Sequence, residues 1–136
     1  MKVKLDNGAY MPVRVHSTDA GLDIRSPIKT VVPARGSVTI RTGVHIKLPP
    51  NTYGRIASKS GLMVHHGILT DGTVDEGFSG EICVCLFNLS DAGYYVERGD
   101  KIAQLIVQPC QYVPVEPVEE IHGGERGENG FGSTGK

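Results

Sequence analysis

Apolar and polar residues alternate along much of this chain, a period of two that is typical of β-strands with one buried face. The alternation is clearest in residues 37–48. Thr42 and Gly43 interrupt the period there, and an extra residue of this kind indicates a β-bulge. The pattern therefore predicts one long strand with a bulge, ended by the proline-rich turn at residues 49–51.

Further short strand patterns occur along the chain, at residues 1–16, 30–33, 81–88, 94–96 and 101–108. Residues 81–88 are apolar on both alternating sets, so this strand is expected to be covered on both faces. The only helical pattern is a short one at residues 60–66. The 18 glycines and 8 prolines among 136 residues exceed the average usage of roughly 12%, which favours short strands joined by tight turns. An all-β fold with one short helix follows.

The length is that of a single domain, which we place at residues 1–118. From Glu119 onward the sequence is nearly free of apolar residues, and such a composition is typical of a flexible segment. Residues 119–136 are therefore predicted to form a C-terminal arm.

The net charge of −1 leaves no broad basic field for binding nucleic acid. No apolar run reaches the roughly 18 residues of a membrane span, and the N-terminus lacks the apolar core of a signal peptide. We expect a cytoplasmic protein, of cellular, phage or viral origin. The three cysteines show no metal-binding spacing and are expected to be buried thiols.

Residues 55–80 hold the densest set of chemically active side chains. The run at residues 57–61, Ala-Ser-Lys-Ser-Gly, offers hydroxyls, an ammonium and backbone N–H groups, which suit an anion such as phosphate. Asp75, in the glycine-flanked run at residues 72–80, suits a base that activates water. Phe78 suits stacking on a ring-shaped ligand. Together these features indicate a site that binds and hydrolyses a nucleotide.

Each feature taken alone has a simpler interpretation. Asp75 could be a turn residue, Ser60 a helix N-cap, and residues 98–100 a turn before a strand. Residues 130–136 match part of a phosphate-binding P-loop, but a P-loop needs a strand before it and a helix after it. The adjacent histidines His65 and His66 do not converge on one metal ion.

Five segments change this picture when they are taken together and in order. Residues 20–26, 55–62, 72–80, 98–105 and 126–135 resemble the five motifs of the trimeric dUTPases. The resemblance covers essentially the whole chain. It implies a jelly-roll-like antiparallel β barrel, a C3 homotrimer whose C-terminal arms are exchanged between subunits, and active sites shared among the three subunits.

The resemblance also implies an activity. Proteins of this family split dUTP between its α- and β-phosphorus atoms, giving dUMP and pyrophosphate, with Mg2+ bound to the triphosphate. The reaction limits uracil incorporation into DNA and supplies dUMP for thymidylate synthesis.

The roles of individual residues follow from matching the motifs. Asp75 matches the residue that positions the attacking water, and Asp23 the acid that acts on the metal through water. Arg55 and Asp100 match a structural ion pair behind the site. Four residues match phosphate-binding positions: Lys59, Ser60, Gly61 and Gln104.

The base and sugar have matching positions as well. Uracil would be bound in a hairpin between Gly72 and Cys83, largely by backbone groups that include Thr73 and Val74. Phe78 would stack on the deoxyribose. The residues of the arm that would close over the site are Arg126, Phe131 and Gly132.

Two positions depart from the family pattern. Phe78 replaces the usual tyrosine, which keeps the ring but loses a polar contact. Asn129 replaces a common glycine and tolerates left-handed geometry better than most residues. The alternatives are a dCTP deaminase-like enzyme, a regulatory or binding protein on the same scaffold, as in phage proteins with a second role, and a generic β-barrel module.

Overall fold

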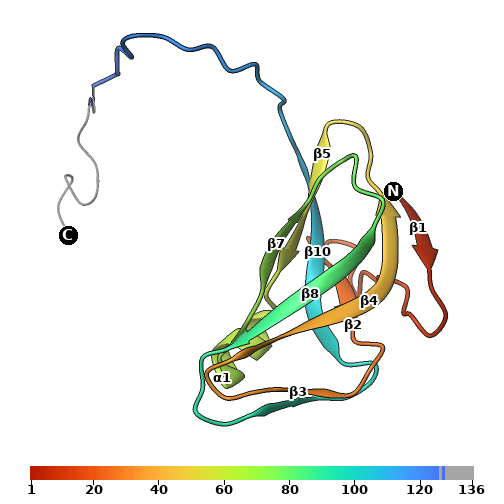
Figure 1. The fold of residues 1–136 in the computed structure, drawn as a ribbon. Coiled ribbons are helices and arrows are strands. Elements are labelled where there is room, and N and C mark those ends of the chain that lie inside the picture. Colours follow the sequence, from red (N-terminus) through yellow and green to blue (C-terminus); the bar gives the residue numbers. More distant parts are fainter. Residues whose placement is uncertain (126, 128–136) are drawn as a thin grey trace.

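The computed structural model describes residues 1–125 and 127, and nearly all of its regular structure is antiparallel β-sheet (Figure 1). The elements run in the order β1 (Lys2–Leu5), β2 (Leu22–Arg25), β3 (Thr30–Val32), β4 (Ser37–Lys47), β5 (Thr52–Ala57), α1 (Ser60–His66), β6 (Ile68–Leu69), β7 (Asp71–Val74), β8 (Glu81–Asn88), β9 (Tyr94–Val96) and β10 (Lys101–Pro109). The predicted all-β class with one short helix is confirmed.

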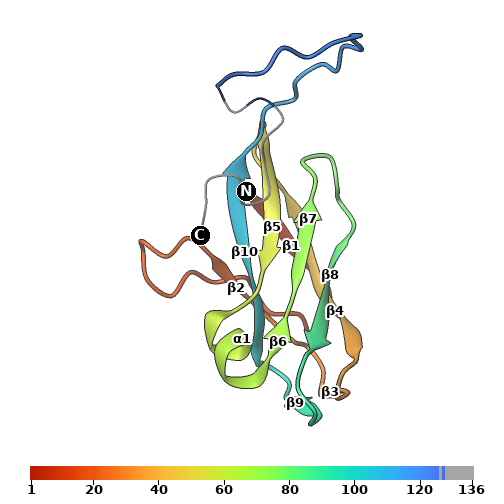
Figure 2. The same ribbon diagram turned by 90° about the vertical axis from the view of Figure 1, so that its left-hand side faces the viewer.

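Two four-stranded sheets form the body of the molecule, in the strand orders β1-β4-β8-β6 and β2-β10-β5-β7 (Figure 2). β3 and β9 pair separately as a two-stranded ribbon. Among the described residues no ladder closes the two large sheets into a full barrel. Alternate residues of each strand form one core between the sheets, which includes Ile24, Ile40, Val44, Ile56, Ile82, Val84, Leu86, Ile102 and Leu105.

The long strand β4 confirms the predicted bulge. Its register with β8 shifts between Arg41 and His45. Gly43 adopts a left-handed backbone conformation at φ +68°, which favours glycine. The hydroxyl of Thr42 donates to the carbonyl of Ile82 at 2.6 Å and accepts the N–H of Val44 at 3.2 Å, so the buried polar groups at the bulge are satisfied.

Two expectations about strands are wrong. The first strand ends at Leu5, because Asp6 turns the chain at the β4 bulge, where its N–H donates to the carbonyl of Gly43 at 2.8 Å. β8 alternates between buried and open positions rather than being covered on both faces. Its outward face leaves Phe87 48% exposed and Cys83 exposed, so the expectation of buried thiols also fails at Cys83.

The helix α1, the only one among the described residues, has the bounds that the sequence predicts. None of its residues is buried, and it ends at Gly67, whose φ of 66° lies in the left-handed region. Lys59 occupies its N-cap position without a side-chain capping bond. No helix among residues 1–125 is long and apolar enough to cross a membrane.

Beyond β10 the chain leaves the sheets and extends away from them (Figure 1). Glu76, in the turn that follows β7, anchors the start of this segment. Its carboxylate accepts hydrogen bonds from the hydroxyl of Tyr112 at 2.7 Å and from the N–H of Asn51 at 2.8 Å. The bond to Glu76 raises the pKa of Tyr112 to about 12.

The anchor makes a testable prediction. A raised pKa means that the Tyr112–Glu76 contact is fully present below the ordinary tyrosine pKa of 10.0 and is lost as the pH rises through about 12. Absorbance titration of tyrosinate should therefore show one tyrosine that ionises at about pH 12, absent from Tyr112→Phe and shifted toward 10.0 in Glu76→Gln. Tyr94, whose pKa is raised by burial and by Asp100, should ionise late in every variant. Tyr95→Phe, at an exposed position, is the control. A step at about pH 12 that survives in Tyr112→Phe would contradict the anchor.

Candidate active site

Three neighbouring strands bring together the residues predicted to bind phosphate. In the antiparallel register of β2, β10 and β5, Gln104 lies opposite Asp23 on one side and Ala57 on the other. Lys59 follows Ala57 after one residue, and the Nε2 of Gln104 donates to the carbonyl of Ser58 at 3.0 Å. Strand pairing therefore places three of the motifs side by side although they are far apart in the sequence.

Asp23 is the electrostatic centre of this group. It is 8% exposed, and its two carboxylate oxygens accept hydrogen bonds from Lys59 and from Lys101, the latter at 2.7 Å. Burial would raise the pKa of Asp23, but the hydrogen bonds and charges of Lys101 and Lys59 outweigh burial and lower it below the ordinary 3.8. The carboxylate thus holds two ammonium groups in place.

A cavity of about 300 Å³ opens beside this cluster, lined by Val15, His16, Asp19, Ala20, Gly21, Asp23, Lys59, Lys101 and Gln104. Gly21 is needed there, because a Cβ at this position would lie 2.3 Å from Oε1 of Gln104. Lys101 belongs to the site, and the motif matching did not single it out. The pairing of residues 22–25 with residues 101–105 is the feature that would have identified it.

The two arms of the predicted uracil hairpin are paired only at the end far from the turn, where β6 meets β8. β8 pairs with β6 at Leu69 and Ile68, but β7 pairs with β5 in the other sheet, and no ladder joins β7 to β8 among the described residues. Continued with the same register, the pairing would set Thr73 opposite Cys83. Figure 2 shows β7 and β8 as the two arms of one loop. β7 and β8 are therefore two open arms joined by a turn, and among the described residues their facing backbone edges have no strand partners. Binding of uracil between them stays a prediction.

The turn between β7 and β8 carries Asp75 and Phe78. Asp75 is exposed and follows directly after β7, and its carbonyl accepts the N–H of Phe78 at 3.0 Å. The ring of Phe78 folds over Gly80, where an added Cβ would lie 2.5 Å from Cζ of the ring. Phe78 is still 44% exposed, so one face of the ring is open to a ligand.

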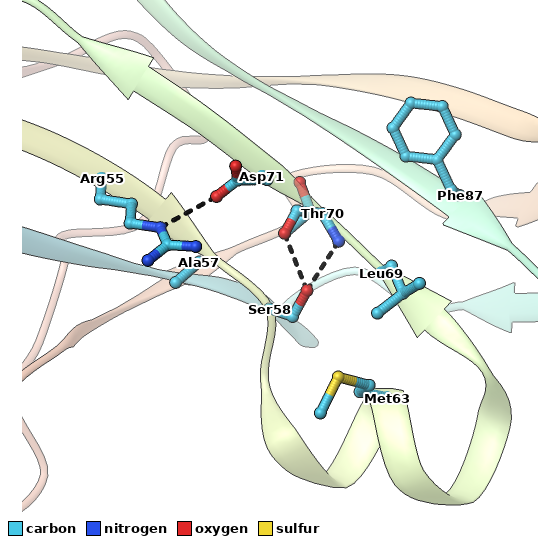
Figure 3. A pocket seen from close by; sticks show the side chains of 8 residues that line it. All are labelled: Arg55, Ala57, Ser58, Met63, Leu69, Thr70, Asp71 and Phe87. Atoms are coloured by element: carbon cyan, nitrogen blue, oxygen red, sulfur yellow. Dashed lines mark hydrogen bonds and ion pairs between the residues drawn. The ribbon is translucent and has the colours of Figure 1, made fainter. Parts of the chain in front are cut away.

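The hydroxyl of Ser58 joins the two sheets near α1. It donates to the carbonyl of Thr70 at 2.8 Å and accepts the N–H of Thr70 at 2.8 Å (Figure 3). Both residues line a second cavity, of about 550 Å³, together with Arg55, Ala57, Met63, Leu69, Asp71 and Phe87.

The ion pair expected between Arg55 and Asp100 is wrong within the chain. The Nε of Arg55 donates to Asp71 at 3.0 Å across this cavity (Figure 3). Arg55 lies opposite Ile106 in the β5–β10 ladder, well along the strand from Asp100. The carboxylate of Asp100 instead accepts the N–H of Glu97 at 2.8 Å and closes a local turn.

The two halves of the predicted site lie apart in one chain. Val74 is paired with Gly54, so Asp75 lies beside Tyr53 at one end of β5, whereas Lys59 lies beyond the other end. Six residue steps of extended chain lead from Tyr53 to Lys59, or roughly 20 Å. The predicted arm residues Arg126, Phe131 and Gly132 lie outside the described residues.

Metal-binding side chains do not cluster in the part of the chain that the structure describes, where no three of His, Cys, Asp or Glu converge on one point. Asp23 already binds two ammonium groups. The donor set therefore fits a metal that arrives with an anionic ligand better than a cage built from protein side chains.

Comparison with known proteins supplies the family. A family model described as dUTPase matches residues 7–135. The deoxyuridine 5'-triphosphate nucleotidohydrolase of Clostridium kluyveri is 42% identical over 135 residues, which cover 97% of this chain and 94% of that protein. The corresponding enzyme of Eremothecium gossypii is 45% identical, with coverage of 99% and 90%.

Solved structures of dUTPases are also similar to this chain. The Staphylococcus bacteriophage 80alpha dUTPase with dUPNHPP superposes with a TM-score of 0.92 at 30% identity, covering 99% of this chain and 98% of that chain. That work describes phage dUTPases as controlling the transfer of virulence genes. A dUTPase variant from phage phi11 of S. aureus, described as revealing the coordination of a structural Mg(II) ion, has a TM-score of 0.80 at 29% identity, with coverage of 88% and 96%. The chain, whose five ordered motifs and two-sheet fold agree with these relatives, belongs to the dUTPase family.

Proposed function

We propose that this protein hydrolyses dUTP to dUMP and pyrophosphate. The observation that carries the proposal is the pair of unpartnered backbone edges on β7 and β8, with Asp75 and Phe78 in the turn that joins the strands. A base, a sugar and a reacting phosphate would each meet a suitable group there. The expected cytoplasmic location stays a prediction.

The base would be selected by backbone groups of residues 72–74 and of Cys83. Uracil presents O4 as an acceptor and N3–H as a donor, which strand N–H and C=O groups complement. Cytosine reverses both groups, so donors would face donors and acceptors would face acceptors, leaving buried polar groups unpaired.

Asp75 would orient and deprotonate the water that attacks the α-phosphorus. A carboxylate is suited to this role when it lies within hydrogen-bond reach of the water. Its exposed side chain makes no hydrogen bond with other described residues, so it is available to a ligand. Phe78 would stack on the deoxyribose and leave little room for a 2′-hydroxyl.

The triphosphate would bind at Lys59, Ser60, Gly61 and Gln104, with Lys101 added from the geometry of the site. Lys59 and Lys101 are already ordered by Asp23, so little side-chain entropy remains to be lost on binding. Mg2+ chelated by the phosphate oxygens would neutralise part of their charge, and Asp23 would contact its water shell.

A complete site would require more than one chain, and we propose a homotrimer. Asp75 and Lys59 lie at opposite ends of β5, so one nucleotide cannot contact both within a single subunit. The segment after β10 also carries apolar side chains that the chain itself leaves uncovered, at Val113, Val115, Val118 and Ile121. Burial of these side chains on a neighbouring subunit would favour assembly and exchange of the arms.

Parallel assays of pyrophosphate release test the activity. The protein should act on dUTP and leave dCTP, dTTP and UTP nearly untouched, because each competitor mismatches the backbone groups, the fit at C5 or the ring of Phe78. Comparable turnover of UTP or dTTP would contradict the proposal. Release of ammonia from dCTP would favour the deaminase-like alternative instead.

Asp75→Asn tests the proposed base. The amide is nearly isosteric but cannot accept a proton from water, so turnover should fall by about 10²- to 10⁴-fold while dUTP affinity changes much less. Asp91→Asn is a matched control, because Asp91 is exposed and pairs with Arg35 at 2.7 Å, away from the site. Near-normal turnover in Asp75→Asn would remove this residue from the mechanism.

Mixing two inactive variants tests the shared site. Asp75→Asn and Lys59→Met should each be inactive alone, with Lys101 remaining as the counterion of Asp23. Trimers assembled from equal amounts of both should regain roughly a quarter of wild-type activity. About one site in four then has an intact Asp75 from one subunit and an intact Lys59 from another. Folded mixed trimers without activity, or a sedimentation mass equal to the 14.6 kDa monomer, would contradict the proposed assembly.

A further inference from the structure

His45 joins three parts of the chain through its imidazole ring. It lies on β4 just after the bulge, and its side chain is 21% exposed. Its Nδ1 lies 3.2 Å from the carbonyl oxygen of Ser79, in the turn that carries Phe78. Its Nε2 lies 3.1 Å from the carboxylate of Asp6, just after β1.

Both partners of the ring are acceptors. The carbonyl of Ser79 has no proton to donate, and neither has the ionised carboxylate of Asp6. A neutral imidazole carries one N–H and could satisfy only one of them. Both contacts are hydrogen bonds at once only when both ring nitrogens are protonated, that is, in the imidazolium form.

The turn held by His45 is also restrained at Glu76, which accepts hydrogen bonds from Asn51 and Tyr112, but its later residues have few other contacts. Gly77 has no heavy atom within 4 Å of an added Cβ position, and Phe78 is 44% exposed. Within the turn, the backbone bond from Phe78 to Asp75 closes one end. The bond from His45 to Ser79 ties the other end to β4.

We propose that His45 is a positioning residue, whose imidazolium fixes the turn between β7 and β8 so that Phe78 and Asp75 are ready for the nucleotide. The proposal rests on the proposed dUTP hydrolysis, to which it adds a residue outside the motifs. It also assigns a role to the first strand, since Asp6 holds the imidazolium from that side.

Several charged side chains lie near His45, on β4 itself and on the neighbouring strands. Asp6 favours the imidazolium, whereas Lys4 opposes it, and Lys2 and Lys47 line the same groove. Glu81 lies opposite His45 in the β4–β8 register. Its carboxylate is already engaged by the guanidinium of Arg41 at 2.6 Å and the N–H of Gly43 at 2.8 Å, which leaves Asp6 as the hydrogen-bonded counterion of His45.

The balance of these groups sets the pH range of the clamp formed by Asp6, His45 and Ser79. The hydrogen bond to Asp6, followed by that to Ser79, raises the pKa of His45 above the ordinary 6.5. The same bond lowers the pKa of Asp6 below 3.8. The clamp is therefore fully present between 3.8 and 6.5. It is lost as the pH rises through the higher folded-state pKa of His45 or falls through the lowered folded-state pKa of Asp6.

Three variants test this role in the full-length protein. His45→Gln should lower kcat/KM for dUTP by about 2- to 10-fold at neutral pH, the value of one hydrogen bond, and should lack the alkaline decline due to the clamp. Asp6→Asn keeps an acceptor but loses the charge, so the decline should move to lower pH. His65→Gln, at an exposed helix position, should match the wild type.

Measurements that do not depend on activity complete the test. In the NMR titration of the imidazole groups, the resonance missing from His45→Gln should titrate above 6.5 in the wild type and lower in Asp6→Asn. Amide exchange at residues 77–80 should quicken as His45 loses its proton. An ordinary His45 pKa, or the same alkaline decline in His45→Gln, would overturn the proposal. Absence of dUTP hydrolysis in the wild type would overturn the proposed function, while the titration and exchange data still judge the clamp.

Discussion

The hydrogen bonds between Ser58 and Thr70 are the constraint on which the site depends. At Thr70 the chain passes from β6, which pairs with β8, to β7, which pairs with β5. The backbone polar groups of Thr70 would be buried without partners at this crossing, and the hydroxyl of Ser58 satisfies both of them. Ser58 directly precedes Lys59. The same contact therefore fixes both the point at which the chain crosses from β6 to β7 and the position of Lys59.

The crossing determines how the active site is divided. β7 pairs with β5 along one edge, and among the described residues no strand pairs with its other edge, which could therefore meet a base. The same pairing carries Asp75 to the end of β5 opposite Lys59. The residues proposed to bind the base and those proposed to bind phosphate are thus separated by the length of a strand, and this separation is the reason why we propose that subunits assemble around one nucleotide. The anchor from Tyr112 to Glu76 starts the C-terminal segment beside Asp75, in the turn that we propose to be catalytic.

Local patterns in the sequence predicted local structure well. Period two identified β4 and its bulge at Thr42 and Gly43, and the short helical pattern matched α1. The errors concern partners that lie far away in the sequence. The sequence pattern of residues 71–83 does not say which sheet each arm joins, and the partner of Arg55 depends on that choice, since pairing of β5 with β7 brings Asp71 beside it. Cys83 was misjudged for a similar reason, because an apolar run does not reveal whether a second layer covers it. The candidate catalytic residues came from ordered motifs, whereas Lys101 and His45 became visible only once strands were paired.

Electrostatics explains how a chain with a net charge of −1 can present a local positive charge at the site proposed to bind the triphosphate. Two ammonium groups close together repel each other, and the buried carboxylate of Asp23 offsets that repulsion while it fixes both positions. The cluster thus carries a local charge of about +1 and needs no basic field elsewhere. Removing Asp23 would increase the positive charge but would release the side chains that the charge is meant to present. The cluster of Asp23, Lys59 and Lys101 and the hydrogen bonds between Ser58 and Thr70 have the same effect. In each, a buried polar group orders a neighbouring residue before a ligand arrives.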